Sequence, residues 1–248
     1  MSDESILFIH GAFTDGDDWD LVVPHLADYH LIMPDLPGHG QSKEFRPFSV
    51  NDAVDRLARL IILTALGGRA HVVGHSLGAK IGIALASAHP DIVKDVIVSG
   101  FEVYPPNALT PYLPYVVWAD QRIENAIPRP LIRWLMDGTD VRRSNISTST
   151  LALCRDITSP MQETVWPLPW SARTLVIAAG KGGIIPSADH PHDAKKLAKI
   201  GREKNEATIA VTHPRMRHPW NRQEPGLFAE TVKAWIERQE YPDGFVEL

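Results

Sequence analysis

Short apolar runs alternate with segments of helical spacing through most of this chain, and this alternation restricts its fold more than any other feature. The first four runs are residues 5–9, 30–33, 70–73 and 93–99. Continuous apolar runs of this length predict strands that are buried on both faces. Strands that alternate with helices predict a mostly parallel α/β sheet with helices on both faces.

The helical patterns between these runs predict where the covering helices lie. Asp17 and Asp18 precede an apolar-faced segment and predict a helix with an acidic first turn. Residues 49–66 carry apolar side chains three and four apart, with Ser49 or Asn51 as a cap and glycines at the end. Further strands and helices are expected at 77–89 (helix), 174–178 (strand), 186–200 (helix), 207–211 (strand) and 223–238 (helix).

One long segment interrupts the alternation. From about residue 103 to residue 170 the chain is rich in proline, tryptophan and tyrosine, and regular strand spacing is lost. Insertions in parallel sheets lie over the carboxyl ends of the strands, where ligands bind. We therefore expect a core formed by residues 1–102 and 171–248, with residues 103–170 as a cap.

Charge and cysteine content narrow the partners and the location that we expect. The formal net charge is −5, which does not favour a nucleic-acid partner. No apolar run is long enough to span a membrane, and the acidic start does not resemble a secretory signal. The single cysteine, Cys154, allows a reducing compartment, so a cytoplasmic protein is expected. The oligomeric state is left open.

The sequence Gly74-His75-Ser76-Leu77-Gly78 predicts a reactive serine. It follows an apolar run directly and opens a helix of small residues, the strand–turn–helix setting that this pattern requires. In such a tight turn, side chains two positions before and after the serine would clash with neighbouring backbone, so glycine is needed there. The serine hydroxyl would be exposed at a helix N-terminus, where a developing negative charge is favoured.

Three motifs in order resemble those of the α/β-hydrolase family. They are His10-Gly11-Ala12-Phe13, the stretch from Asp35 to Ser42, and the turn at Ser76. The resemblance covers nearly all of the chain and implies the α/β-hydrolase fold with a helical cap. It also implies a serine hydrolase, with Ser76 as nucleophile. The stretch from His10 to Ser42 is similar to the menaquinone-pathway lyases of this family.

The resemblance also implies the groups that assist Ser76. Two backbone N–H groups, those of Ala12 and Leu77, would form an oxyanion hole. A histidine after the last strand would be the base, and His218, seven residues before Pro225, is preferred to His213. The residue before His218 is arginine, where the family usually has glycine.

The carboxylate that should orient the base is harder to place. Its usual position, aligned on Pro186, is occupied by Gly182. Some family members supply the acid after the preceding strand, and Glu102 at that place is the first choice. A site without a carboxylate is the second alternative, and Asp189 is the third.

The expected reaction is hydrolysis of an ester or thioester, lactones included, of a small to medium apolar or aromatic molecule. Neither a metal nor an organic cofactor is expected, although His190 and His192 beside Asp189 and Asp193 leave a metal site as an alternative. A carbon–carbon lyase or cyclase that uses the same serine and histidine, or a receptor with a silent site, are the other candidate functions. The expected substrate-binding residues are Phe13, His75, Tyr104, Trp118 and Trp134.

Overall fold

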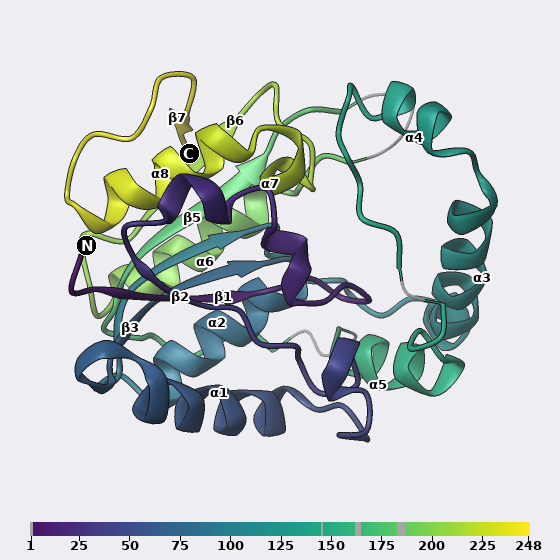
Figure 1. The fold of residues 1–248 in the computed structure, drawn as a ribbon, viewed down its shortest axis with the longest axis horizontal. Helices are drawn as coiled ribbons and strands as arrows, with labels where there is room; N and C mark the ends of the chain where they lie inside the picture. Colours follow the sequence, from purple (N-terminus) through teal and green to yellow (C-terminus); the bar gives the residue numbers. More distant parts are fainter. Residues whose placement is uncertain (1, 145, 162–164, 183–186) are drawn as a thin grey trace.

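A twisted sheet forms the centre of the molecule (Figure 1). The computed structural model describes residues 2–144, 146–161, 165–182 and 187–248. In the described residues the strand order is β2-β1-β3-β4-β5-β6-β7, and neighbours are parallel except β6 and β7. This confirms the predicted parallel α/β architecture. The strands are β1 (Ser5–Ile9), β2 (His30–Ile32), β3 (Ala70–His75), β4 (Val93–Ser99), β5 (Arg173–Ala179), β6 (Ile209–His213) and β7 (Val246–Glu247).

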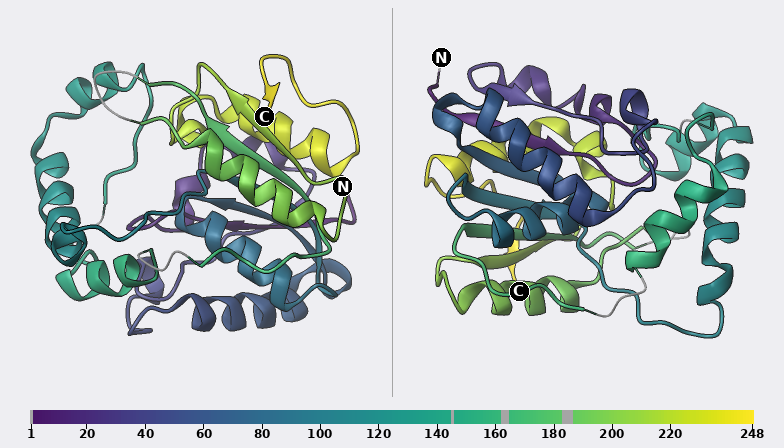
Figure 2. Two further views of the ribbon diagram at one scale, coloured as in Figure 1. Left: turned by 180° about the vertical axis from the view of Figure 1, so that it is seen from behind. Right: turned by 90° about the horizontal axis from the view of Figure 1, so that it is seen from below.

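Side chains alternate along each strand between two apolar cores, one on each face of the sheet. In β1, Leu7 and Ile9 join the core under one set of helices, while Ile6 and Phe8 join the opposite core. The first core is covered by α1 (Val50–Thr64), α2 (Leu77–Ala88) and α6 (Pro191–Arg202), and the second by α8 (Pro225–Ile236) (Figure 2). Both faces of the sheet are therefore buried, as the apolar runs predict.

The prediction of a helix after Asp17 and Asp18 is wrong. The chain instead forms two short 3-10 turns, η1 (Gly16–Trp19) and η2 (Val23–Leu26). Pro24 lacks the N–H that a continuing α-helix would need. Trp19 and Leu26 are nevertheless fully buried in the second core, so the apolar spacing correctly marked the buried side chains.

The strand expected at 207–211 is found at Ile209–His213, and two helices also differ from those expected. The helix expected at 186–200 begins at Pro191, and residues 183–186 lie outside the described part of the chain. The helix expected at 223–238 is divided into α7 (Trp220–Gln223) and α8, with Glu224 between them. Pro225 begins α8, and proline favours a first helical position because its missing N–H is not needed there.

The segment between β4 and β5 lies beyond one end of the sheet (Figures 1 and 2). It contains α3 (Leu113–Ala126), α4 (Arg129–Leu135) and α5 (Leu151–Met161), and α3 packs against α5. This end holds the carboxyl ends of the parallel strands, because Ser76 follows β3 there. Across the described ranges, no helix is both long and apolar enough to cross a membrane.

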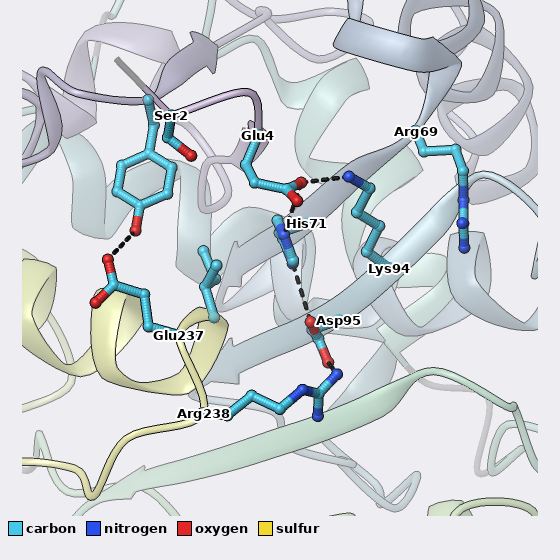
Figure 3. A pocket seen from close by; sticks show the side chains of 10 residues that line it. Ser2, Glu4, Arg69, His71, Lys94, Asp95, Glu237 and Arg238 are labelled. Carbon is cyan, nitrogen blue, oxygen red and sulfur yellow. Dashed lines mark hydrogen bonds and ion pairs between the residues drawn. The ribbon is translucent and has the colours of Figure 1, made fainter.

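A charged network occupies the opposite end of the sheet, around a cavity of about 500 Å³ (Figure 3). The buried His71 ring lies between two carboxylates, with Nε2 3.3 Å from Glu4 and Nδ1 3.1 Å from Asp95. Asp95 also pairs with Arg173 at 2.9 Å and with Arg238 at 3.4 Å. Burial alone would raise the pKa of the Asp95 carboxyl, but His71 and Arg173 hold that pKa below its ordinary value.

Candidate active site

Ser76 lies on a strained turn between β3 and α2. Its backbone has φ 55° and ψ −113°, a conformation that non-glycine residues rarely adopt. Its N–H donates to the carbonyl of Ser99 at 2.8 Å, which fixes the turn against β4. A Cβ at Gly74 would overlap the carbonyl of Gly78, and one at Gly78 would overlap that of Ile9. The two glycines are therefore required by close backbone contact, as the sequence predicts.

Two backbone N–H groups border the serine. Leu77 is the first residue of α2, so its N–H has no acceptor within the helix. The Ala12 N–H belongs to the same peptide unit as the Gly11 carbonyl, and the two point in opposite directions. That carbonyl is bound by His10 Nδ1 at 2.7 Å and by the Thr14 hydroxyl at 3.1 Å. The Ala12 N–H is thus directed away from the His10 ring.

The loop that carries Ala12 is held by a neutral histidine. Burial lowers the pKa of His10 to about 4, so its ring is uncharged near neutral pH. Its Nδ1–H then donates to Gly11, while Nε2 accepts from the Leu36 N–H at 2.9 Å. Asp35 accepts from the N–H groups of Gly16 and Gln41, both at 2.7 Å. The first two sequence motifs therefore bind each other and fix the loop after β1.

His218 is paired with Asp189. Its Nδ1 lies 2.5 Å from a carboxylate oxygen of Asp189, while about a third of its side chain stays exposed. The other Asp189 oxygen accepts from the Ala179 N–H at 2.7 Å, and the Asp189 N–H donates to the Ala179 carbonyl at 2.8 Å. These bonds to the end of β5 fix the carboxylate, which in turn orients the imidazole and leaves Nε2 unused by this pair.

The charge state of His218 depends on this pair. Burial alone would lower the pKa of the ring, but the hydrogen bond and the negative charge of Asp189 raise it above its ordinary value. Glu102 and Asp18 add to this effect at longer range. The site thus stabilises an imidazolium, the form that a general base takes after it accepts a proton.

Glu102, the first choice for the carboxylate beside the base, is placed elsewhere. Its oxygens accept from the hydroxyl of Tyr104 and from the backbone N–H of His190, the latter at 3.2 Å. The carboxylate beside His218 is that of Asp189, the last of the three alternatives. The alignment on Pro186 missed it because Asp189 lies after that proline, seven residues beyond Gly182.

His213, the alternative base, faces another region. It is buried at the end of β6, and its ring packs against Phe245 with ring centres 5.0 Å apart. Burial lowers its pKa, and the cationic Arg215 adds to this. His218, by contrast, lines the same cavity as Ser76.

This cavity, of about 370 Å³, lies between the carboxyl end of the sheet and α3. Ala12, Phe13, His75 and Ser76 line it together with His218. The His75 and His218 ring centres are 4.7 Å apart, and burial lowers the pKa of His75 well below its ordinary value. Phe13 and His75 are thus placed where substrate-binding residues are expected.

Three aromatic residues expected to bind substrate are not among the residues that line this cavity. Trp134 is 76% exposed on α4. Trp118 packs under the guanidinium of Arg122, whose carbon lies 3.7 Å from the ring centre. Tyr104 donates its hydroxyl to Glu102. Helix α3 instead presents Val117, Asp120, Gln121 and Glu124 to the cavity, and aromatic composition gave no signal for these residues.

Arg217, which replaces the usual glycine, joins three loops around the base. Its guanidinium donates to Asp137 at 2.5 Å and to the Ser187 hydroxyl at 2.7 Å. The Ser187 carbonyl accepts from the His218 N–H at 2.7 Å. Arg217 therefore connects the chain after α4 to the loops that carry Asp189 and His218, a role that the sequence did not reveal.

The alternative of a metal site near His190 finds no geometric support. His190 Nδ1 lies 3.8 Å from oxygens of both Glu102 and Asp193, but its side chain is largely exposed. Asp189 is engaged by His218. Nowhere in the described ranges do three histidine, cysteine or acidic side chains form a group that could hold a metal ion.

Comparisons with known proteins bear on the family and the fold of this chain. A model of the alpha/beta hydrolase family matches residues 6–231. An AB hydrolase superfamily protein of Gibberella zeae is 44% identical over 244 residues, which cover 98% of this chain and 83% of that protein. Lipase LipV of Mycobacterium tuberculosis is 36% identical over 93 residues, which cover 38% of this chain and 35% of the lipase.

Solved structures share the fold. A thermophilic esterase from Thermogutta terrifontis superposes with a TM-score of 0.70 at 20% identity, over 95% of this chain and 90% of that chain. A marine microorganism esterase superposes with a TM-score of 0.66 at 19% identity, over 94% of this chain and 95% of that chain. At such identities the likeness concerns the fold alone.

Proposed function

Because this chain belongs to the alpha/beta hydrolase family, we propose that it is a serine hydrolase that cleaves esters or thioesters, lactones included, with Ser76 as nucleophile. One observation carries this proposal. Ser76 and His218 line the same cavity, and Asp189 holds the Nδ1 side of the His218 ring at 2.5 Å. The Nε2 side of that ring is then available to a hydroxyl proton.

The groups of the site have defined roles in this reaction. His218 takes the Ser76 proton as Oγ attacks the substrate carbonyl, and Asp189 stabilises the imidazolium that forms. The N–H groups of Ala12 and Leu77 donate to the oxyanion. His218 then protonates the leaving group, and finally activates the water that hydrolyses the acyl-enzyme. Residues 103–170 serve as a cap over the core of residues 1–102 and 171–248.

The cavity sets the size and character of the substrate. About 370 Å³ accommodates a small to medium molecule. The expected preference for an aromatic group loses its main support, since Tyr104, Trp118 and Trp134 are not among the lining residues. Phe13, Val117 and Val141 retain an apolar part of the wall, which suits an alkyl chain.

The two alternative functions are less well supported. A carbon–carbon lyase is favoured by the similarity of the stretch from His10 to Ser42 to menaquinone-pathway lyases, and Gly182 at the usual acid position also fits a lyase, which needs no full deacylation. Asp189 now supplies a carboxylate beside the base. A silent receptor would not require a strained serine and a histidine paired with a carboxylate to line one cavity.

The test is turnover of p-nitrophenyl acetate and of a short-chain thioester by the purified chain, compared with Ser76→Ala. We expect measurable turnover by the native protein, a pre-steady-state burst of one product per site, and loss of both in the variant. Turnover that persists in Ser76→Ala would contradict the proposal. Absence of turnover with both substrates would also contradict it.

A further inference from the structure

The wall of the cavity opposite Ser76 is formed by one face of α3. Val117, Asp120, Gln121 and Glu124 are spaced so that they share this face, and all four line the cavity. Three of them carry side-chain oxygens, and two of these are carboxylates. The surface that a bound ester would meet is therefore rich in hydrogen-bond acceptors.

These two carboxylates have no counter-ion from the cavity itself. Arg142 lines the cavity but pairs with Asp15 at 2.8 Å and with Asp17 at 3.1 Å. Arg222 lines it as well and pairs with Asp20 at 2.7 Å. For Asp120 and Glu124, no ion pair with a lysine, arginine or histidine occurs in the part of the chain that the structure describes.

The negative charge of Glu124 is unfavourable when the cavity holds no positive group. Burial raises the pKa of this half-buried carboxyl, and the neighbouring charge of Asp120 raises it further, while Arg143 opposes both effects. The attraction of a positive group placed in the cavity would offset these two unfavourable contributions. The cavity thus gains electrostatic energy from a cationic occupant and loses it with an anionic one.

Gln121 supplies an independent observation on the same face. Its side chain is 4% exposed and lines the cavity, and its Nε2 lies 3.9 Å from Cys154 Sγ. Its Oε1 is buried and has no hydrogen-bond partner among the described residues. A buried carbonyl without a donor is costly, so a ligand N–H would stabilise it.

Resting on the proposed serine hydrolase function, we infer that the preferred substrate is an ester or thioester with a protonated amino or guanidino group, bound by Glu124, Asp120 and Gln121 of α3. An apolar linker would cross the Phe13 and Val117 part of the wall. The reacting carbonyl would lie at Ser76, between the N–H groups of Ala12 and Leu77.

A series of p-nitrophenyl esters of equal chain length tests this inference. The 6-aminohexanoate ester carries an ammonium group, the heptanoate ester has a methyl group in its place, and the adipate monoester has a carboxylate. We expect kcat/KM for the ammonium ester to exceed that for the heptanoate ester by about tenfold, in line with a partly buried ion pair. The adipate ester should be the poorest substrate.

Variants assign the preference to α3. Glu124→Gln should reduce the ammonium-to-methyl ratio of kcat/KM about fivefold, and Asp120→Asn should reduce it less, because Asp120 is more exposed. Glu203→Gln, which removes the same charge from an exposed position after α6, is the matched control and should keep the native ratio. A 6-(trimethylammonio)hexanoate ester, which has charge but no N–H, should lose the contribution of Gln121 and bind less well than the amine.

The outcomes separate the two proposals. Equal use of the three esters, a preference for the adipate ester, or a ratio unchanged in Glu124→Gln would overturn the cationic substrate and leave the serine hydrolase intact. Failure of every ester in the series, together with failure of p-nitrophenyl acetate, would overturn both.

Discussion

Each end of the sheet carries a histidine paired with a buried carboxylate, and the two pairs differ in what surrounds the ring. At the amino end, His71 has Glu4 at 3.3 Å and Asp95 at 3.1 Å on its two nitrogens, and arginines complete the network. At the carboxyl end, Asp189 occupies Nδ1 of His218, and the remaining side of the ring belongs to the cavity that Ser76 also lines.

The difference shows what separates a structural histidine from one that is suited to catalysis. The His71 ring has an acidic partner on each nitrogen, so neither nitrogen is left to take a proton from a hydroxyl, and the ring connects the residue before β1 to β4. His218 pairs with Asp189 through Nδ1 and lines the same cavity as Ser76, whose backbone is strained. The end of the sheet at which each histidine lies decides its role, since the loops after the carboxyl ends of the strands carry the functional residues in such sheets.

Replacing the aspartate by asparagine should lower activity at the carboxyl end and stability at the amino end. The larger effect is expected at the carboxyl end. Asp189→Asn keeps the size of the side chain but removes the charge that stabilises the His218 imidazolium. We expect kcat to fall by about 10³- to 10⁴-fold, measured with p-nitrophenyl acetate. Glu102→Gln is the control and should retain most activity. A larger loss in Glu102→Gln than in Asp189→Asn would restore Glu102 as the acid.

Gly100 offers a test of how the His218 ring is positioned. Gly100 has φ 72°, and a Cβ there would lie 2.5 Å from His218 Cε1. Gly100→Ala should displace the ring and reduce kcat by about 10²-fold, as small misplacements of catalytic groups do.

The matched variant for this experiment is Gly138→Ala. Gly138 has a similar φ of 83°, but a Cβ there would meet nothing within 4 Å. Gly138→Ala therefore introduces similar backbone strain but no contact with His218. Equal kcat values for the two variants would show that strain, and not the His218 contact, causes the loss.

The dependence of activity on pH should follow His218. In the proposed reaction its neutral form is the base, and Asp189 raises its pKa above the ordinary value against the opposing effect of burial. Activity should therefore fall about tenfold for each pH unit below this pKa, with the midpoint above the ordinary value of a histidine. A kcat/KM profile that stays flat from about pH 5 to pH 8 would remove His218 from this role.

At the amino end the effect should appear in stability and not in turnover. Asp95→Asn leaves Arg173 and His71 without their buried partner, and we expect the free energy of unfolding in urea to fall by about 2–4 kcal/mol. The kcat of the folded variant should match the native value. A loss of kcat with unchanged stability would contradict the division between the two ends.

The contribution of this charged network to the stability of the fold should be lost in acid. The pKa values of Asp95 and Glu4 are lowered in the fold, so their stabilisation is complete above the unfolded values and is lost as pH falls through the folded values. The native protein should therefore lose stability below about pH 4 more steeply than Asp95→Asn. Parallel unfolding curves for the two proteins across this range would rule out the network as the cause.

Much of this arrangement could be predicted from local sequence. The buried strands and the turn at Ser76 follow from apolar runs and from glycines that close backbone contact requires. The preference for His218 over His213 came from spacing to Pro225 and agrees with the pairing that the structure shows. These features are short-range, so the residues that decide them lie together in the chain.

The missed features depend on contacts between distant segments. Asp189 is separated from β5 by a loop whose path the alignment could not supply, and Glu102 was favoured by position alone. Arg217 connects to Asp137, 80 residues away. The acidic face of α3 also escaped prediction, because nothing in the segment 103–170 shows which side of a helix meets the serine.

The most direct measurement is labelling with a fluorophosphonate, followed by intact mass and peptide mapping. The account predicts one adduct per chain, located on Ser76, with rapid labelling of the native protein and of Asp95→Asn but slow labelling of Asp189→Asn. A native protein that remains unlabelled across neutral and alkaline pH, or an adduct on another residue, would contradict the assignment of the carboxyl end as the catalytic one.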